Sequence, residues 1–406
     1  MGNSLLTTLL LLVVGIGFAR FTATHLDRWA VPAIVLELAV GFVLGNTVLP
    51  FPQIRPLSGL MELGVLTLFF QVGLEVRGGL LGSRPAAVLH TVLLSALTPL
   101  LAWWPLQQAF GLEPSATLLF VAALSATGTG VNLRVLAQRD ALNTPSGRLL
   151  VGVSVLDDLP AIALLTMALV LGSRVGTPGV GPPAEGPGLG LGGLVLGVLV
   201  VSASFPLSRW WLRRHGALKP DALGVILLLI TCSWLGEFTG LTSLSGALWG
   251  GVLLGRLAPM GQGSIEAREL RSELRSSLAL LSDVFLPLYF IGVGMRIELA
   301  TLQQLASWQM AVVLIALGVA LKLICALGIS RRDQAAGVDR WVVVFGLIPR
   351  GLPGLVFAST ALGAGVISPL QYSALVLMVM VTTVLGLLLL GQRLQALSLS
   401  DQSGEC

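Results

Sequence analysis

Residues 149–170 read LLVGVSVLDDLPAIALLTMALV, and this stretch decides how the chain is interpreted. It is long enough to cross a bilayer as one helix, yet two adjacent aspartates, Asp157 and Asp158, lie near its centre. A carboxylate at the bilayer centre costs on the order of 2.5 to 3.5 kcal/mol even on insertion scales. The pair therefore predicts a functional site inside a membrane-spanning helix.

The composition indicates a polytopic membrane protein. Of 406 residues, 55% are hydrophobic and 11% are charged, whereas soluble domains carry roughly a quarter charged residues. The 49 glycines suit the close helix approach of membrane bundles. Three cysteines and three histidines without motif spacing favour no disulfide framework, zinc site or redox cofactor. The net charge of +4 needs no nucleic-acid partner, because basic residues gather on one side of a membrane.

Segments that are long and apolar enough to span number about 13, at roughly 20 residues each. We expect them at 4–19, 29–46, 57–76, 85–106, 114–133, 149–171, 189–208, 220–236, 242–255, 280–295, 307–329, 341–362 and 369–391. The ninth is short, so about 12 spans are the alternative. No Lys or Arg precedes the first, which we expect to be a retained helix rather than a cleaved signal peptide.

The distribution of basic residues predicts the orientation of the chain across the membrane. Loops after odd-numbered spans, with the tail, carry 19 of the 24 Lys and Arg residues, and the even-numbered loops carry three, Arg55, Arg174 and Arg296. Because basic residues collect on the cytoplasmic side, we expect the N-terminus outside and the C-terminus in the cytoplasm of a cell (inner) membrane. The remaining two, Lys322 and Arg350, must lie within the membrane.

Lys322 is the obvious counter-charge for one aspartate. The alternative is that Lys322 and one aspartate form a simple neutralising ion pair, but the second aspartate then has no counter-charge. That acid must be protonated or hold a cation, which is the competition that an exchanger needs. Pro160 cannot donate to the carbonyl of Leu156, and Ser154 lies on the same helical side. Hard cations favour such oxygen ligands.

Two other spans contain interruptions. Residues 125–132 read SATGTGVN and residues 348–354 read IPRGLPG, and both are poor helix interiors. Interrupted helices at corresponding places in two halves are typical of inverted-repeat transporters with a midplane ion site. Ordinary membrane-helix glycines and prolines are the alternative. We expect two discontinuous crossing helices, shaped by Gly128, Gly130, Asn132, Pro349, Arg350, Gly351 and Pro353.

These motifs resemble a known family. The segments 153–158 (VSVLDD), 127–136 ending NLRVL, 240–247 (GLTSLSGA) and 348–351 (IPRG) are similar to the monovalent cation:proton antiporter-2 family, over nearly the whole membrane chain. The paired aspartates resemble electrogenic sodium/proton antiporters of the NapA and NhaA type. The resemblance implies an all-α membrane protein with an NhaA-like inverted-repeat fold.

The resemblance also implies roles for single residues. Asp158 would be the principal carrier of cation and proton, and Asp157 would form a salt bridge with Lys322. Thr127 and Thr129 of the broken fifth span would lie near the ion, beside Ser154 of the sixth. Relatives often carry Glu after Pro-Arg-Gly, where this chain has Leu352, so any role of that Glu is absent. For Arg350 we expect a helix-terminus or interhelical contact.

The expected domains follow from the spans and the resemblance. A scaffold would comprise residues 1–84 and 220–306, and an ion-transporting core would comprise 85–172 and 307–393. Residues 173–219 would form an external loop and a linker helix, and 394–406 a short cytoplasmic tail. Residues 264–281 read as a cytoplasmic surface helix leading into the tenth span. The resemblance implies a homodimer formed through the scaffold.

The predicted function is electrogenic exchange of cytoplasmic sodium or lithium for external protons by alternating access, in the service of pH homeostasis. A potassium/proton antiporter is the nearest alternative, and a sodium-coupled solute symporter is a weaker one. From other classes, an intramembrane aspartyl protease is opposed by geometry, because neighbouring carboxyls on one helix diverge. A non-transporting scaffold leaves the buried acids and Lys322 unexplained. We therefore expect a secondary transporter in the bilayer and not an enzyme.

Overall fold

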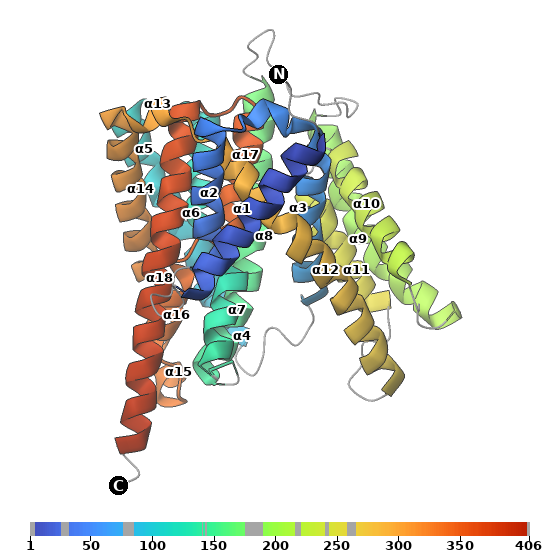
Figure 1. Ribbon diagram of the computed structural model, residues 1–406. Coiled ribbons are helices and arrows are strands. Elements are labelled where there is room, and N and C mark those ends of the chain that lie inside the picture. Colours follow the sequence, from blue (N-terminus) through green and yellow to red (C-terminus); the bar gives the residue numbers. More distant parts are fainter. Residues whose placement is uncertain are drawn as a thin grey trace. The chain divides into compact units, whose positions relative to one another are not determined.

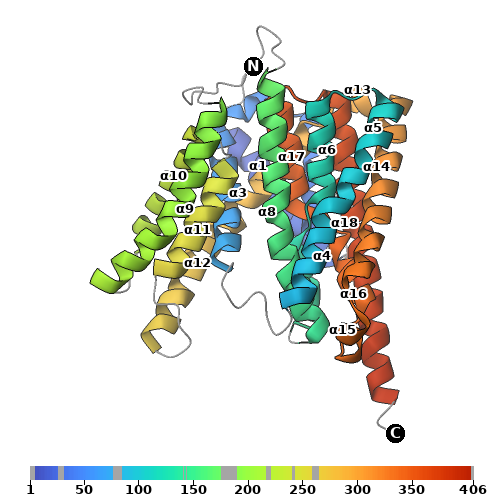
Figure 2. The ribbon, with the colours of Figure 1, turned by 180° about the vertical axis from the view of Figure 1, so that it is seen from behind.

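The computed structural model describes residues 5–25, 32–75, 85–139, 141–142, 144–174, 190–215, 221–239, 243–257 and 265–403. Within these ranges the regular structure is helical and contains no β-strand (Figures 1 and 2). In lipid every backbone N–H and C=O must find a partner within the protein, and an apolar helix satisfies this by itself. The predicted all-α class is therefore confirmed.

The chain forms two compact units. The first comprises Met1–Phe51, Gly79–Val180 and Val293–Cys406, and the second comprises Pro52–Gly78 and Gly181–Gly292. Residues 1–51 and 293–306, which we expected in the scaffold, fall in the same unit as residues 85–172 and 307–393 of the expected core. Which part moves during transport is a separate question and stays a prediction.

The first unit contains most of the helices. They are α1 (Leu5–His25), α2 (Ala33–Thr47), α4 (Pro85–Leu97), η4 (Thr98–Ala102), α5 (Trp103–Phe110), α6 (Pro114–Ser125), α7 (Thr129–Gln138), α8 (Pro145–Arg174), α13 (Leu299–Leu302), α14 (Leu305–Ile324), η5 (Cys325–Gly328), α15 (Arg331–Ala335), α16 (Arg340–Leu347), α17 (Gly351–Gly363) and α18 (Pro369–Ser403). The short helix η2 (Phe51–Gln53) begins at Phe51, the last residue of the first segment of this unit.

The second unit contains η3 (Arg55–Leu57), α3 (Ser58–Glu75), α9 (Gly190–His215), α10 (Ala222–Phe238), α11 (Ser243–Leu257) and most of α12 (Ile265–Met295). Glycine lets α3 and α12 approach closely, because a Cβ at Gly64 would lie 2.7 Å from the carbonyl carbon of Phe285. Between α9 and α11, the indole Nε1 of Trp249 donates to Ser204 Oγ at 2.9 Å. Small residues at such contacts are typical of helix packing in membranes.

Every predicted span overlaps one, two or three consecutive helices, and the main differences lie at the ends. The expected surface helix is the start of α12, and α18 continues through the expected tail to Ser403. Of the expected external loop, Ser173 and Arg174 end α8, and residues 175–188 lie outside the described ranges. The helix before this loop therefore ends later than we expected, and the loop begins later.

Helices of membrane-spanning length support a multi-pass membrane protein. Among the described residues, six stretches are long and apolar enough to cross a membrane: Leu6–His25, Ala86–Phe110, Pro145–Gly172, Leu305–Gly328, Arg340–Gly363 and Pro369–Leu397. Shorter apolar helices accompany them, including Ala33–Thr47 and Ala222–Phe238. The total number of spans stays a prediction.

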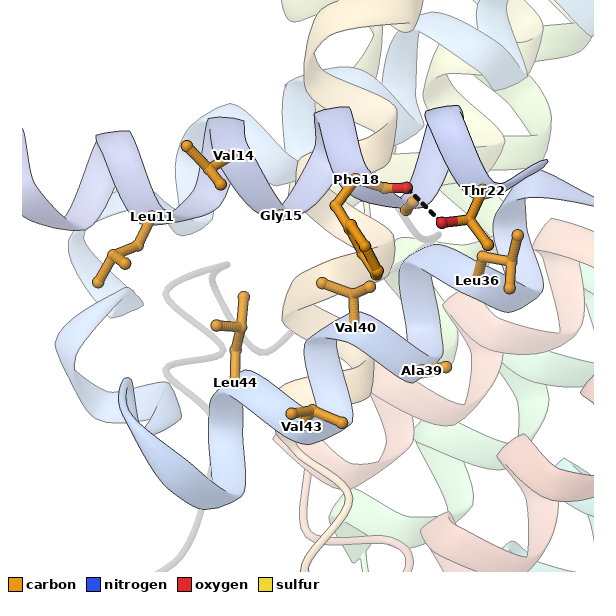
Figure 3. A pocket seen from close by; sticks show the side chains of 11 residues that line it. Leu11, Val14, Gly15, Phe18, Thr22, Leu36, Ala39, Val40, Val43 and Leu44 are labelled. Atoms are coloured by element: carbon orange, nitrogen blue, oxygen red, sulfur yellow. Dashed lines mark hydrogen bonds between the residues drawn. The ribbon is translucent and has the colours of Figure 1, made fainter. Parts of the chain in front are cut away.

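A pocket of about 450 Å³ lies between α1 and α2 (Figure 3). Its walls are almost wholly apolar, with Val14 and Phe18 on α1 facing Val40 and Leu44 on α2. The hydroxyl of Thr22 already donates to the carbonyl of Phe18 at 2.8 Å. Such a lining offers no charged ligand for a cation, so this pocket is not a candidate ion-binding site.

Candidate ion-binding site

The two aspartates lie on α8, which carries Pro160 within the helix. Asp157 is fully buried and Asp158 is 1% exposed. Neighbours on a helix point about 100° apart, and the two carboxyls accordingly have different partners. Because a buried carboxylate is costly unless its oxygens are paired, these partners indicate what each acid can do.

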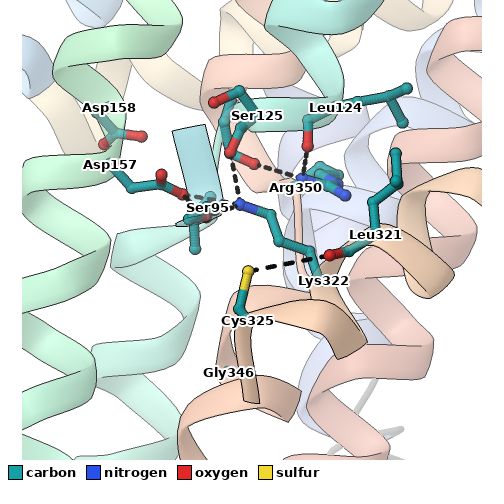
Figure 4. Close-up of polar contacts among 12 residues, drawn as sticks. Ser95, Leu124, Ser125, Asp157, Asp158, Leu321, Lys322, Cys325, Gly346 and Arg350 are labelled. Carbon is teal, nitrogen blue, oxygen red and sulfur yellow. Dashed lines mark hydrogen bonds and ion pairs between the residues drawn. The ribbon is translucent and has the colours of Figure 1, made fainter. Parts of the chain in front are cut away.

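Asp157 pairs with Lys322, which lies near the end of α14. Lys322 Nζ is 2.9 Å from Asp157 Oδ2, and neither side chain is exposed to solvent (Figure 4). Two hydroxyls donate to the same oxygen, Ser95 Oγ of α4 at 2.8 Å and Thr127 Oγ1 at 2.6 Å. Three donors thus converge on Oδ2.

Lys322 has further acceptors besides the carboxylate. Its ammonium donates to the carbonyl of Ser125 at 2.8 Å and to Thr127 Oγ1 at 3.4 Å. It also donates to Ser95 Oγ, so that this hydroxyl bridges the two charged groups. The lysine is therefore bound to α4, α8 and the end of α6 together.

Asp158 has no basic partner among the described residues. Its Oδ2 accepts from Thr129 Oγ1 at 3.3 Å, and the carboxyl also accepts from the backbone N–H of Thr127. Asp158 Oδ1, Asp157 Oδ1 and Ser154 Oγ are buried without a hydrogen-bond partner in the described chain. Oxygens of this kind are the ligands that hard monovalent and divalent cations accept.

The expected crossing residues lie where two helices are interrupted. The chain leaves α6 at Ser125 and enters α7 at Thr129, and it leaves α16 at Leu347 and enters α17 at Gly351. The two interruptions touch, because the N–H of Gly128 donates to the carbonyl of Pro349 at 2.6 Å. The inverted symmetry of the two halves stays a prediction.

Glycine is required at this contact. Gly351 has φ of 51°, and a Cβ there would lie 2.8 Å from Gly128 Cα. Asn132 of α7 donates from Nδ2 to the carbonyl of Gly346 in α16 at 2.5 Å, which adds a second link. The other two expected residues, Gly130 and Pro353, lie within the first turns of α7 and α17.

Arg350 lies in the interruption between α16 and α17 and is fully buried. Its guanidinium donates to three carbonyls, those of Leu124, Ala126 (3.1 Å) and Gly318 (2.7 Å). These contacts join the end of α6 to α14 through partners that the sequence did not identify.

Sequence reasoning missed Ser95. It is one hydroxyl residue in an apolar span, and Thr91, one turn earlier on α4, is equally buried yet has no hydrogen-bond partner in the described chain. Nothing in the sequence separates the two. The described residues contain no group of three or more His, Cys, Asp or Glu that could hold a metal ion.

Known antiporters are similar to this chain in sequence. The chain is 27% identical over 343 residues to the high-affinity Na(+)/H(+) antiporter NhaS3 of Synechocystis sp., covering 82% of this chain and 70% of the relative. It is 23% identical over 369 residues to the Na(+)/H(+)-K(+) antiporter GerN of Bacillus cereus, covering 88% of this chain and 89% of the relative.

The fold matches a solved structure, that of the sodium proton antiporter MjNhaP1 from Methanocaldococcus jannaschii. The TM-score is 0.64 at 16% sequence identity, and the match covers 96% of this chain and 97% of the other. The family model for the transmembrane region of sodium/hydrogen exchangers matches residues 9–391. With this match over nearly its whole length, the chain belongs to the transmembrane sodium/hydrogen exchanger family, whose members are transporters and not enzymes.

Proposed function

We propose that this protein exchanges cytoplasmic sodium for external protons, with Asp158 as the carrier of both ions. The observation that carries the proposal is the unequal pairing of the two acids. Asp157 is bound to Lys322, whereas Asp158 has only hydroxyl and backbone donors among the described residues and one unpaired oxygen. A carboxylate in this state must bind either a proton or a cation, so the two ions compete for one site.

The unpaired oxygens near the aspartates supply the remaining ligands in this proposal. A cation at Asp158 would also use Asp157 Oδ1 or Ser154 Oγ, which are buried without partners in the described chain. Thr129 and the N–H of Thr127 orient the Asp158 carboxyl. The hydroxyl of Thr127 contacts Asp157, so its part is to position the pair rather than to bind the ion.

We further propose that exchange is electrogenic. If cation binding releases protons from both Asp158 and the Asp157/Lys322 pair, two protons enter for each cation that leaves. One net charge then crosses per cycle, worth about 2.3 kcal/mol per 100 mV. The membrane potential can thus drive sodium out of the cell.

Alternating access in this account moves a core of residues 85–172 and 307–393 against a scaffold of 1–84 and 220–306 in a homodimer. The cytoplasmic excess of basic residues supports an N-terminus outside and a C-terminus inside the cell (inner) membrane. Crosslinking in native membranes, with cysteines introduced on either side, tests both the dimer and the orientation.

Sodium is the cation that both the family description and the first relative name, and potassium is the nearest alternative because GerN is named for both ions. The test uses purified protein in vesicles that contain a trapped pH dye, with sodium, lithium, potassium or choline added outside. We expect sodium and lithium to move protons and potassium to do so weakly. Potassium equal to sodium would favour the alternative, and exchange that needs an organic solute would favour a symporter.

A further inference from the structure

Two buried cations bind the same helix end. The carbonyls of Leu124, Ser125 and Ala126 follow one another at the end of α6, and they accept hydrogen bonds from Arg350, Lys322 and Arg350 in turn (Figure 4). The last carbonyls of a helix lack partners within the helix and carry a partial negative charge. Interrupted backbone at membrane depth must find its partners within the protein or in a water-filled cavity, and here the two side chains supply protein donors.

The two cations differ in their other contacts. Lys322 also binds Asp157, so its ammonium serves both the carboxylate and the helix end. Arg350 binds carbonyls alone among the described residues, and its third acceptor is Gly318, one turn before Lys322 on α14. Arg350 therefore links α6 to α14 without using either aspartate.

Ionisable groups from three elements lie near Arg350. They are Lys322 on α14, Asp157 on α8 and the thiol of Cys325 in η5. The sequence of α6 contains no ionisable residue, and α18 places Thr382 beside Gly318. Of the two bases in this group, Arg350 is an arginine, which stays protonated in proteins.

We propose that Arg350 is a positioning residue that holds the carbonyl end of α6 independently of Lys322. Lys322 can then release its proton and its contact with Asp157 while the broken helix stays in place. The fixed charge of Arg350 also opposes proton retention by the neighbouring groups. This inference rests on the sodium/proton exchange proposed above, and exchange by the parent protein is the control that separates the two.

The test compares the pH dependence of sodium-driven exchange in vesicles for the parent, Arg350→Gln and Arg350→Lys. Arg350→Gln removes the fixed charge, so the pH of half-maximal exchange should move by about one to two units towards alkaline values. Arg350→Lys keeps the charge and should stay within about half a unit of the parent, with a lower unfolding temperature because an ammonium cannot reproduce the planar donor fork.

The matched control is Arg296→Gln, which removes another arginine that donates to a carbonyl, that of Ser359 at 3.3 Å. Its pH dependence should equal that of the parent. The proposal is overturned if folded Arg350→Gln keeps the parent's pH dependence, or if the pH dependence of Arg296→Gln shifts as far as that of Arg350→Gln.

If Arg350→Gln cannot be recovered folded, the result for Arg350→Lys tests the proposal. An unchanged pH dependence supports the proposal, whereas a shift of about one pH unit, or loss of exchange by folded protein, overturns it. Failure of the parent to exchange sodium would instead overturn the proposed function.

Discussion

Lys322 Nζ and Asp157 Oδ2 lie 2.9 Å apart with both side chains fully buried. The bond joins the last turn of α14 to the middle of α8, two helices that are far apart in the sequence. Removing one partner of a buried pair leaves an uncompensated charge, which typically costs about 3 to 5 kcal/mol. The pair therefore links the two helices and, in the proposed mechanism, binds and releases one proton.

Lys322→Ala tests both roles. We expect a lower unfolding temperature in detergent, because Asp157 keeps only the hydroxyls of Ser95 and Thr127. We also expect the charge moved per cycle to change, since one proton-binding group is lost. Thermal unfolding and sodium-jump currents on solid-supported membranes measure the two effects. A variant equal to the parent in both would argue against the assignment.

Ser95→Ala should destabilise the site even though Ser95 carries no charge. Both Asp157 and Lys322 lose a hydrogen-bond partner, and a hydrogen bond to a charged group contributes roughly 1.5 to 3 kcal/mol. Thr91→Val is the matched control on the same helix, because its buried hydroxyl has no hydrogen-bond partner in the described chain. We expect a lower unfolding temperature for Ser95→Ala alone. Equal effects of the two variants would remove Ser95 from the site.

Gly351→Ala should impair folding at the contact between the two interruptions. The left-handed φ of 51° disfavours a side chain by roughly 1 to 2 kcal/mol, and the new methyl group would overlap Gly128. Gly363→Ala, in the last turn of the same helix, meets no atom within 4 Å and serves as control. Yield of folded protein and unfolding temperature report the difference. If Gly351→Ala matches Gly363→Ala, the close contact is not required.

Asp339→Asn should change how stability depends on pH. Asp339 precedes α16, and its carboxylate binds Arg393 of α18 at 2.6 Å. Burial opposes ionisation, but hydrogen bonds from Arg393 and from the N–H groups of Val342 and Trp341 outweigh it, so the pKa of Asp339 lies below its ordinary value of 3.8. The stabilisation is therefore complete above the unfolded-state pKa and is lost as pH falls through the lower folded-state value.

The difference in unfolding temperature between the parent and Asp339→Asn should thus be constant above about pH 5. It should shrink towards zero as the pH falls below about 4. The asparagine oxygen still accepts from the helix N–H groups, so the comparison isolates the ion pair, worth on the order of 1 kcal/mol at this partial exposure. A difference that stays constant down to acid pH would show that charge pairing is not the cause.

The sequence predicted the parts of this molecule that follow from burial of charge. Among the basic residues, only Lys322 and Arg350 could not be assigned to a loop. Lys322 could therefore be named as the counter-charge of one aspartate. The carbonyls that Arg350 binds could not be named, because every residue has a carbonyl and only the fold selects among them. Ser95 was missed for a similar reason.

The ends of the helices and the grouping of the units were also beyond the sequence. Apolar length marks where a helix crosses lipid, but α8, α12 and α18 continue past the apolar segment into polar residues. Residues 1–51 fall in the unit that contains the two aspartates, and no motif in them indicates this grouping. Tertiary packing, rather than local pattern, decides such contacts.

The central claim is that Asp158 carries the exchanged ions, and Asp158→Asn in proteoliposomes tests it most directly. Asp221→Asn is the matched control, since that aspartate caps α10 by accepting from Gly224 at 2.9 Å, and an asparagine can do the same. With folding and reconstitution equal to the parent, we predict no sodium-driven proton movement for Asp158→Asn and parental exchange for Asp221→Asn. Exchange at the parental rate by folded Asp158→Asn would contradict the account.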